Sequence, residues 1–340
     1  MKSKKFLGII ATTLLATSVL AACGGQDKAG SSDDGSKKEE AKLTLRLADN
    51  HPVDYPTVIG DQKFADLVSE RTDGRITIEV FPSGQLGDEK SVLEQVQLGA
   101  IDFARTNASP LAEFNAELAV FSVPYLFDND DHLWSFLNSE TGTSLLDGLQ
   151  EAKMQGLAYY DSGSRNYYSS KPLTSVEDLK GLKIRVQQSE MNIKLLDALG
   201  ASATPMPYGE VFSALQTGII DGAENNLPSF DSSNHFQEAK HIIMDGHQRI
   251  PEILLMSKVG WDKLSDKDKE IIKQAAIDSV ETQRQAWADY EKKSLQKITD
   301  AGVTITEVKD LAPWQEAVKP VKDEFAKSYP DLIKAVEEAK

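Results

Sequence analysis

The chain has few of the residues from which disulfides and metal centres are built. Its 340 residues include one cysteine, Cys23, and five histidines. A single cysteine excludes an internal disulfide and any site that needs two thiolates. The histidines, at positions 51, 132, 235, 241 and 247, occur without a Cys-x-x-Cys pair or a His-Glu-x-x-His spacing. We therefore expect neither a metal nor a cofactor.

Sequence signatures of catalysis are also missing. The chain has no Gly-x-x-x-x-Gly-Lys-[Ser/Thr] loop, no Gly-x-Gly-x-x-Gly turn and no Gly-x-Ser-x-Gly elbow. Carboxylate pairs carry little information in a chain with 53 acidic residues. We expect a protein that is not an enzyme. An extracellular hydrolase is the alternative, and it needs an acid–base pair that the sequence does not single out.

Basic residues are outnumbered. Lysine and arginine total 37 against 53 acids, which gives a formal net charge of −16. Removal of the first 22 residues, with three lysines and no acids, changes this to −16 − 3 = −19. A chain this acidic is a poor partner for nucleic acid or an anionic membrane surface.

The only long apolar run lies at the N-terminus. Three lysines precede the apolar stretch 6–20, which is shorter than the ~20 residues of a membrane span and is typical of a signal peptide. The stretch ends in Leu-Ala-Ala-Cys, which resembles the bacterial lipoprotein box. We expect residues 1–22 to be removed and Cys23 to carry lipid, although an ordinary small-residue cleavage site is an alternative. Residues 23–42 are then a flexible, lipid-anchored tether on the outer face of the cell membrane.

Strand and helix patterns alternate along the rest of the chain. Residues 43–48 and 75–80 alternate between apolar and polar like strands, and 62–70 has the pattern of a helix. Ser91 opens a helix with a capping box, and Gly99 ends it. This order predicts an α/β fold with mainly parallel sheets.

An internal sequence repeat indicates two similar lobes. LEQVQLGAIDFA at 93–104 and FSALQTGIIDGA at 212–223 share five identities, and in each a helix ends at glycine and turns into a strand. The helical pattern from Ser265 continues to about Ala301 without glycine or proline. At about 1.5 Å per residue it spans about 50 Å. We expect one helix that lies across both lobes, with two helices and an unmarked bend as the alternative.

Two arginines lie at or after the ends of predicted strands, where α/β proteins commonly bind ligands. In residues 183–187 the polar and apolar positions alternate, which places Arg185 at the carboxyl end of a short strand. A guanidinium can hold a carboxylate through two parallel hydrogen bonds. Arg165 follows the predicted strand 156–160 near Gly163. From the residues alone, each arginine is as well explained by a surface position or by an acidic partner.

Two further groups have similar alternatives. Asn225 and Asn226 close the second repeat, where they fit either a ligand or a turn. Tyr208 precedes a helix, where it fits either a ligand stack or the core.

Four segments together resemble the DctP-type solute receptors of tripartite ATP-independent periplasmic (TRAP) transporters: FPSGQLG at 81–87, GSR at 163–165, LKIRV at 182–186 and ALGASATPMPYGEVFSALQTGIIDGAEN at 198–225. The resemblance runs from about Leu43 to about Lys327. It implies a two-lobed, periplasmic-binding-protein-like α/β fold with mixed, mainly parallel sheets and a long bracing helix. We expect lobe I to comprise 43–162 and 251–290, and lobe II to comprise 163–250 and 291–330.

The resemblance also implies a ligand site. Its motifs match Arg185 to the residue that holds the ligand carboxylate, and Arg165, Asn225 and Tyr208 to further ligand contacts. Less firmly matched positions are Asn50, His51, Asp54 and Glu89 in segments that vary with ligand, Gln187 and Asn226 as partners for ring hydroxyls, and Arg105 and Asn107 as wall residues.

The implied function is capture of an organic acid for delivery to TRAP membrane subunits, by a monomer whose lobes close on the ligand. The segment from Tyr160 to Ser233 looks most like receptors for sugar acids such as glucuronate or galacturonate. The runner-up is a C4-dicarboxylate such as succinate, fumarate or malate. A lipoprotein adhesin, or a sensor ectodomain for the same ligands, is the remaining alternative.

Overall fold

The computed structural model describes residues 42–340. The predicted signal peptide, Cys23 and the tether up to residue 41 lie outside the described residues. Among residues 42–340, no helix combines the length and the apolar composition that crossing a bilayer requires.

The first sheet lies in lobe I and has the order β2-β1-β3-β10-β4. Its strands are β1 (Leu43–Ala48), β2 (Ile76–Phe81), β3 (Phe103–Asn107), β4 (Met154–Tyr160) and β10 (Glu252–Ser257). β1 pairs in parallel with β2 and β3, whereas β10 runs antiparallel to β3 and β4.

The second sheet lies in lobe II and has the order β11-β9-β5-β8-β6-β7. Its strands are β5 (Arg165–Ser169), β6 (Lys183–Val186), β7 (Ser202–Pro205), β8 (Gly222–Asn225), β9 (His241–Gln248) and β11 (Thr304–Glu307). Here β5 is the strand that runs antiparallel to its neighbours β8 and β9. Both sheets are therefore mixed and mainly parallel, as predicted.

The chain passes between the lobes along two neighbouring connections. Residues 161–164 join β4 to β5, and residues 249–251 join β9 to β10. Each connection leads into the strand that runs antiparallel to its neighbours in the next sheet.

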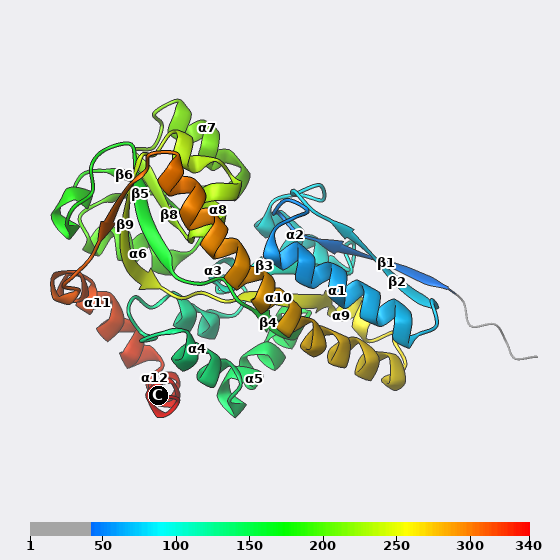
Figure 1. Ribbon diagram of the computed structural model, residues 1–340. Coiled ribbons are helices and arrows are strands. Elements are labelled where there is room, and N and C mark those ends of the chain that lie inside the picture. The colour runs from blue at the N-terminus through cyan, green and yellow to red at the C-terminus, as the bar shows by residue number, and fades with distance from the viewer. Residues whose placement is uncertain (1–41) are drawn as a thin grey trace, which may run out of the picture. The chain divides into compact units, whose positions relative to one another are not determined.

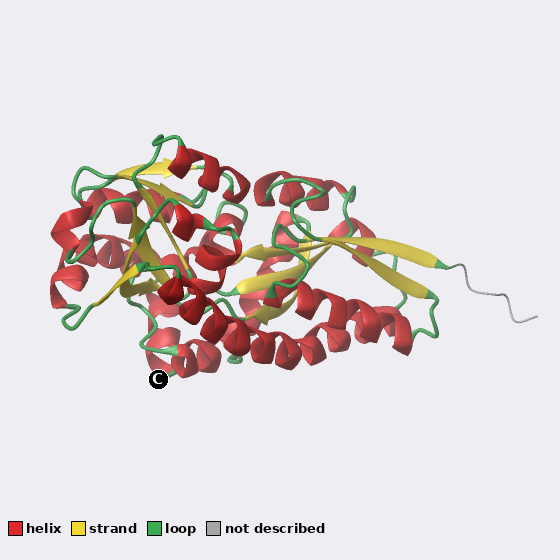
Figure 2. Ribbon diagram, turned by 45° about the horizontal axis from the view of Figure 1, so that its top comes forward, coloured by secondary structure: helices red, strands yellow, loops and turns green. Residues whose placement is uncertain are grey.

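Figures 1 and 2 show the two sheets with helices packed around them. The shorter helices are α1 (Pro56–Arg71), α2 (Glu89–Leu98), α3 (Ala108–Leu111), α4 (Asp130–Leu137), α5 (Glu140–Gly148), α6 (Glu190–Ala198), α7 (Val211–Gln216), α8 (Leu227–Ser232) and α9 (Lys258–Trp261).

A single long helix, α10 (Asp266–Asp300), braces both lobes. Its N-cap is Ser265, whose hydroxyl accepts a hydrogen bond from the backbone N–H of Asp268 at 3.1 Å. Near its start Ile272 is buried in the lobe I core, and near its end Ile298 is buried in the lobe II core. In Figure 1 the helix, in yellow-brown to orange, runs past α1 and α8, which both contact it. The prediction of one uninterrupted helix is confirmed.

The C-terminal pair of helices also contacts both cores. α11 (Ala312–Ser328) buries Trp314 and Val318 in the lobe II core. Its last turn and α12 (Pro330–Glu338) bury Phe325, Leu332 and Val336 in the lobe I core. These two helices therefore link the two cores, and the lobe boundary predicted at residue 330 stays a prediction.

The repeated segments occupy equivalent places in the two sheets. Gly99 and Gly218 both adopt left-handed backbone, with φ of 74° and 70°, and the chain then enters β3 and β8 respectively. The repeated aspartates also make the same contact. Asp102 accepts a hydrogen bond from the backbone N–H of Arg46 at 2.8 Å, and Asp221 accepts one from Lys183 at 2.9 Å. Each aspartate therefore ties the repeat to a neighbouring parallel strand.

The start of α2 differs from the prediction. The helix begins at Glu89, and its N-cap is Asp88, whose carboxylate accepts from the backbone N–H of Ser91 at 3.2 Å. Ser91 therefore lies inside the helix and does not open it. Asp88 and Ser91 are both good capping residues, and the earlier cap adds nearly one further turn, which carries Glu89.

Candidate functional site

A polar cavity lies between the lobes. Lobe I contributes residues that follow β1, begin α2 or lie on β3 and β10, and lobe II contributes residues on or after β5, β6 and β8. The lining comprises Asn50, His51, Glu89, Asn107, Arg165, Arg185, Gln187, Tyr208, Asn225, Ser229 and Glu252. Most of the residues singled out from the sequence are therefore brought together at one place.

Arg185 is a buried cation whose one hydrogen-bond acceptor within residues 42–340 is a backbone carbonyl. Its Nε and Nη2 atoms donate to the carbonyl oxygen of Met206 at 3.1 and 2.9 Å. The side chain lies on β6 and its residue is only 2% exposed, so it is not the surface arginine that the sequence alone allowed. Among residues 42–340 no carboxylate forms an ion pair with it. Burial lowers the pKa of Arg185, because a charge removed from water is destabilised.

Arg165, at the start of β5, has an internal carboxylate partner. Its Nη2 donates to Oε1 of Glu224 at 3.0 Å, and its Nε donates to the other oxygen of the same carboxylate. Burial alone would raise the pKa of Glu224, but Arg165 reverses this effect and the pKa falls to about 2. Behind this pair, Nδ1 of His247 lies 2.9 Å from the Asp245 carboxylate. Arg165 is thus held in place with its charge compensated.

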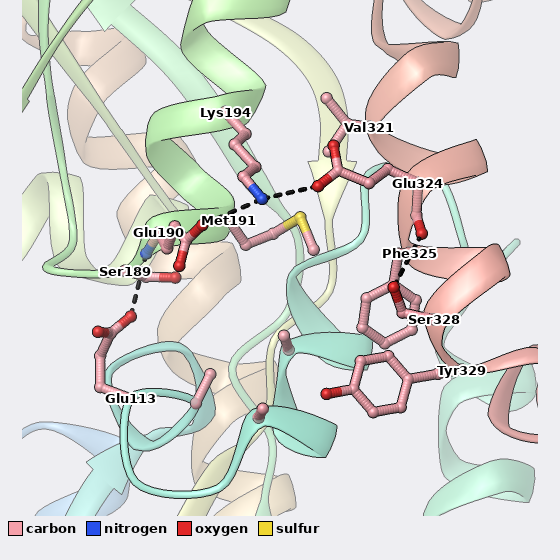
Figure 3. A pocket seen from close by; sticks show the side chains of 13 residues that line it. Glu113, Ser189, Glu190, Met191, Lys194, Val321, Glu324, Phe325, Ser328 and Tyr329 are labelled. Carbon is pink, nitrogen blue, oxygen red and sulfur yellow. Dashed lines mark hydrogen bonds and ion pairs between the residues drawn. The ribbon is translucent and has the colours of Figure 1, made fainter.

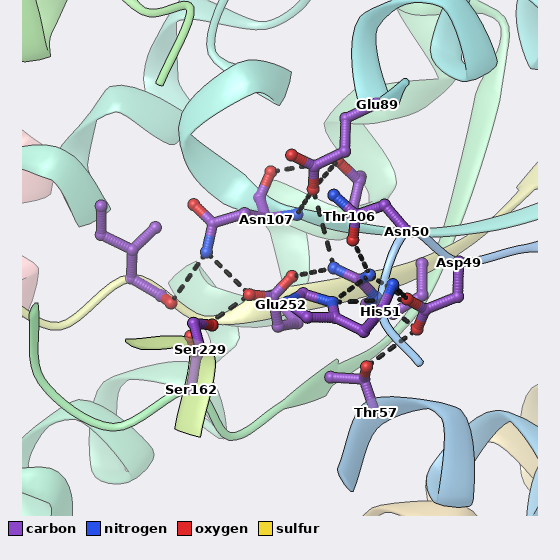
Figure 4. Close-up of polar contacts among 12 residues, drawn as sticks. Asp49, Asn50, His51, Thr57, Glu89, Thr106, Asn107, Ser162, Ser229 and Glu252 are labelled. Carbon is purple, nitrogen blue, oxygen red and sulfur yellow. Dashed lines mark hydrogen bonds and ion pairs between the residues drawn. The ribbon is translucent and has the colours of Figure 1, made fainter. Parts of the chain in front are cut away.

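Arg105, on β3, organises the lobe I wall. Its guanidinium donates to Oδ2 of Asp49 at 2.8 Å and to Oε2 of Glu252 at 2.7 Å, within the network drawn in Figure 4. Its Nη2 atom also lies 2.7 Å from Nδ1 of His51 and 2.5 Å from Oδ1 of Asn50. The same Nδ1 atom lies 3.4 Å from Oδ1 of Asp49. The buried network therefore fixes the position of the His51 ring in the cavity wall.

Aromatic and amide groups complete the cavity. His51 stacks on Tyr55, with ring centroids 3.9 Å apart, and Tyr208 lies 5.2 Å from His51 at a tilt. The Oδ1 atom of Asn225 accepts from the backbone N–H of Asn226 at 2.9 Å, which orients its Nδ2 as the remaining donor. Gln187 presents a buried Oε1 that has no hydrogen-bond partner in the described chain. The cavity therefore offers hydrogen-bond donors and acceptors around one cation without a carboxylate partner.

Residues 47–328 match the family model described as bacterial extracellular solute-binding protein, family 7 (DctP). The chain belongs to this family.

The family 7 receptor is similar to solved TRAP periplasmic solute-binding proteins. One from Xanthobacter autotrophicus Py2, with bound β-D-galacturonate, is 42% identical, and the match covers 87% of this chain and 100% of that chain with a TM-score of 0.85. One from Pseudomonas putida F1, with bound D-glucuronate, is 37% identical over 87% of this chain and 97% of that chain, again with a TM-score of 0.85. A curated solute-binding protein from Chromohalobacter salexigens is 38% identical over 283 residues, or 83% of this chain and 84% of that protein. These matches confirm the predicted family and fold class.

The family works outside the cytoplasm, binds small carboxylates and serves TRAP membrane subunits. It is a receptor family and not an enzyme family. Among the residues that the structure describes, no group of three or more His, Cys, Asp or Glu side chains is placed to hold a metal ion.

Three residues singled out from the sequence lie outside the cavity lining of the receptor. Arg105 is fully buried behind the lining and supports it through its carboxylate partners. Asp54 is exposed in the loop before α1. Asn226 is buried, but its amide is used within the protein: Oδ1 caps α8 by accepting from Ser229 N–H at 2.8 Å, and Nδ2 donates to Ser162 at 3.3 Å. These contacts support the role in a turn, which was the alternative to ligand binding for Asn226.

The sequence did not single out Asp49 and Glu252, the carboxylates that hold Arg105. Asp49 directly follows β1 and Glu252 begins β10. Their positions at strand ends are the sequence feature that could have identified them as site residues. Sequence spacing did not reveal the contacts, because Arg105 lies 56 and 147 positions from these two partners.

A larger hollow lies between α6 and α11, and Figure 3 shows the side chains that line it. Its lysine, Lys194, is already shared by Glu190 at 3.0 Å and Glu324 at 2.8 Å. The Glu113 carboxylate accepts from the backbone N–H of Glu190 at 3.1 Å. Because two carboxylates already neutralise Lys194, this hollow is a weaker candidate for anion binding than the cavity between the lobes.

Proposed function

We propose that this receptor captures a uronate, such as D-galacturonate or D-glucuronate, and delivers it to the membrane subunits of a TRAP transporter. The solute carboxylate binds Arg185 through both oxygens, and Arg165 and Asn225 donate further hydrogen bonds. The lobes close about the two connections at 161–164 and 249–251. The solute is released unchanged, because the proposal includes no chemical step.

The observation that carries this proposal is the set of partners around Arg185. A buried guanidinium whose only acceptor is a carbonyl is costly, because a charge taken out of water needs a counter-charge. A bound carboxylate supplies that charge and occupies the fork with two parallel hydrogen bonds. The neighbouring cations are already matched, so Arg185 is the strongest anion anchor in the cavity.

Support for a sugar acid comes from the rest of the lining and from the relatives. Asn50, His51, Gln187 and Ser229 offer neutral polar groups around the anchor, as a ring with several hydroxyls requires. Relatives of up to 42% identity hold galacturonate or glucuronate. A C4-dicarboxylate presents no hydroxyl-rich ring to these groups.

We also propose that lipid on Cys23 anchors the mature receptor, as a monomer, to the outer face of the cell membrane. Support comes from the Leu-Ala-Ala-Cys sequence after the apolar stretch 6–20. Mass spectrometry of the protein purified from its own membranes tests the anchor. An N-terminal peptide that begins elsewhere, or an unmodified Cys23, would contradict it.

The ligand is tested by thermal denaturation against uronates, aldonates and C4-dicarboxylates. A solute that binds only the folded protein raises its Tm, and we expect the largest rise with galacturonate or glucuronate. Calorimetry should then show that Arg185→Lys weakens uronate binding by about 30- to 100-fold, because lysine keeps the charge but loses the planar fork.

The matched control is Arg46→Lys, which makes the same change at an exposed position of β1 outside the cavity. It should bind uronate as the wild type does. A rise in Tm with succinate or malate but not with any uronate would replace the proposed ligand by a C4-dicarboxylate. Unchanged uronate affinity in Arg185→Lys would contradict the anchor.

A further inference from the structure

One wall of the cavity carries a carboxylate with an unused oxygen. Glu89 begins α2, and its Oε1 accepts from the backbone N–H of Asn107 at 3.1 Å and from the hydroxyl of Thr106 at 3.3 Å (Figure 4). Its Oε2 accepts no hydrogen bond from any residue in 42–340. An ionised carboxylate can only accept hydrogen bonds. Glu89 therefore presents an acceptor and a negative charge to whatever fills the cavity.

The charges of the other cavity groups are matched within the protein. Arg105 contacts the carboxylates of Asp49 and Glu252, and Arg165 contacts the carboxylate of Glu224. Glu89 adds little to the first group, since its Oε1 lies 3.6 Å from Nη1 of Arg105, which already donates to Glu252 at 2.7 Å. Arg105 is thus compensated by two carboxylates before Glu89 is counted.

The site carries a net negative charge before any solute binds, and Glu89 is the source of the excess. With Arg185 and Glu89 included, three arginines face four carboxylates, so the site carries 3 − 4 = −1 before any solute binds. Arg185 lies in lobe II and Glu89 in lobe I, and both line the same cavity. Their charges interact, because Glu89 is one of the groups that oppose the effect of burial on the pKa of Arg185. A solute bound to Arg185 must therefore present its other end to a negative wall.

We propose that Glu89 makes the receptor selective for solutes with a single carboxylate. The Oε2 atom of Glu89 accepts a hydrogen bond from a solute hydroxyl. Its negative charge repels a second carboxylate of a solute bound in the same cavity. Like charges placed together in a complex are a strong source of discrimination. This inference rests on the proposed uronate function and adds to it the residue that separates uronates from diacids.

Glu89→Gln tests the inference, because it removes the charge and keeps the size and one acceptor oxygen. Calorimetry compares D-galacturonate and D-glucuronate with succinate and with galactarate and glucarate, six-carbon acids that carry a carboxylate at both ends. We expect wild type to favour uronates over these diacids by at least about 100-fold. In Glu89→Gln uronate affinity falls up to about tenfold, because an amide is a weaker acceptor, and diacid affinity rises. The uronate-to-diacid ratio therefore drops at least about tenfold.

Glu94→Gln is the matched control, since Glu94 lies exposed on the same helix and outside the cavity lining. It removes one charge and should leave the ratio unchanged. An unchanged ratio in a folded Glu89→Gln receptor that still binds uronate overturns this inference alone. Tight succinate binding by the wild type without uronate binding overturns the proposed ligand and this inference together.

Discussion

At the scale of single residues, three buried arginines differ in their partners and therefore in their roles. Arg105 donates to two carboxylates and supports one wall, and Arg165 is held by one carboxylate. In the described part of the chain, the guanidinium of Arg185 donates to a carbonyl oxygen and to no carboxylate. A buried charge is stabilised by its counter-charge, so the arginine that lacks one inside the protein is the arginine that gains most from an anionic ligand.

A buried acid beneath the same network makes stability depend on pH. Asp61 on α1 is 0% exposed, and within residues 42–340 its two carboxyl oxygens have no hydrogen-bond partner. Burial raises its pKa well above 3.8, and the nearby Asp49 carboxylate raises it further. Between the unfolded and folded pKa values the folded protein keeps a proton that the unfolded chain releases. Stability therefore falls as the pH rises from about 4 towards the folded pKa.

Asp61→Asn should remove this dependence, because asparagine is neutral at every pH. In urea denaturation followed by tryptophan fluorescence, we expect the variant to gain about 2 kcal/mol on the wild type between pH 5 and pH 8. Asp66→Asn, an exposed change on the same helix, is the control and should show no such gain. An equal difference from wild type at both pH values would show that Asp61 does not titrate in this range.

At the scale of elements, α10 fixes the first connection between the lobes. Gln283 bonds the backbone of Asp161 twice, accepting from its N–H at 2.8 Å and donating to its carbonyl oxygen at 2.9 Å. One turn further on, Trp287 packs against Gly163, whose φ is +57°. The connection therefore moves only as its contacts with α10 allow.

Gly163→Ala should disturb this contact. An added Cβ would lie 3.1 Å from the Trp287 indole nitrogen and from a Glu291 oxygen, in a backbone conformation that side chains rarely adopt. We expect a loss of about 2 kcal/mol in unfolding free energy and weaker uronate binding. Thermal denaturation and calorimetry measure the two effects.

Two glycines provide matched controls. Gly181 also has positive φ, at +74°, but an added Cβ would meet nothing within 4 Å, so Gly181→Ala measures backbone strain alone. Gly209 has neither feature, and Gly209→Ala should resemble wild type. If Gly163→Ala loses no more stability than Gly181→Ala and binds uronate normally, the contact with α10 has no role in closure.

Elements with strong local signals were predictable, and contacts between distant segments were not. The strand at 43–48 and the long helix from Ser265 follow from periodicity and capping within the segment itself. The start of α2 was misplaced because two capping residues stand three positions apart and only packing decides between them. The Arg105 network depends on which strands become neighbours, and no local pattern encodes that choice.

At the scale of the whole molecule, the site exists only when both lobes contribute to it. Arg165 and Arg185 come from lobe II, and Glu89 and His51 come from lobe I. The two arginine residues are each 2% exposed, so solvent has almost no access to the anchor when the lobes are together. A solute can enter only after the lobes separate about their two connections.

Small-angle scattering should detect this change. We expect the receptor without solute to have a larger radius of gyration than the receptor saturated with D-galacturonate, because the open form spreads the lobes. D-galactose, which lacks the carboxylate, is the control solute and should leave the value unchanged. Equal radii with and without uronate would show that binding does not require the lobes to move.

Under the proposed function, the bare guanidinium of Arg185 would also let the membrane subunits distinguish a loaded receptor from an empty one. Closure without solute would remove this charge from water and leave it with only a carbonyl. A penalty of about 3 kcal/mol would hold the empty, closed form to roughly one molecule in a hundred. The membrane subunits would then meet closed receptors that are nearly all carrying cargo. The missing counter-charge of Arg185 would thereby reduce docking by empty receptors. The membrane subunits would not need to contact the solute themselves.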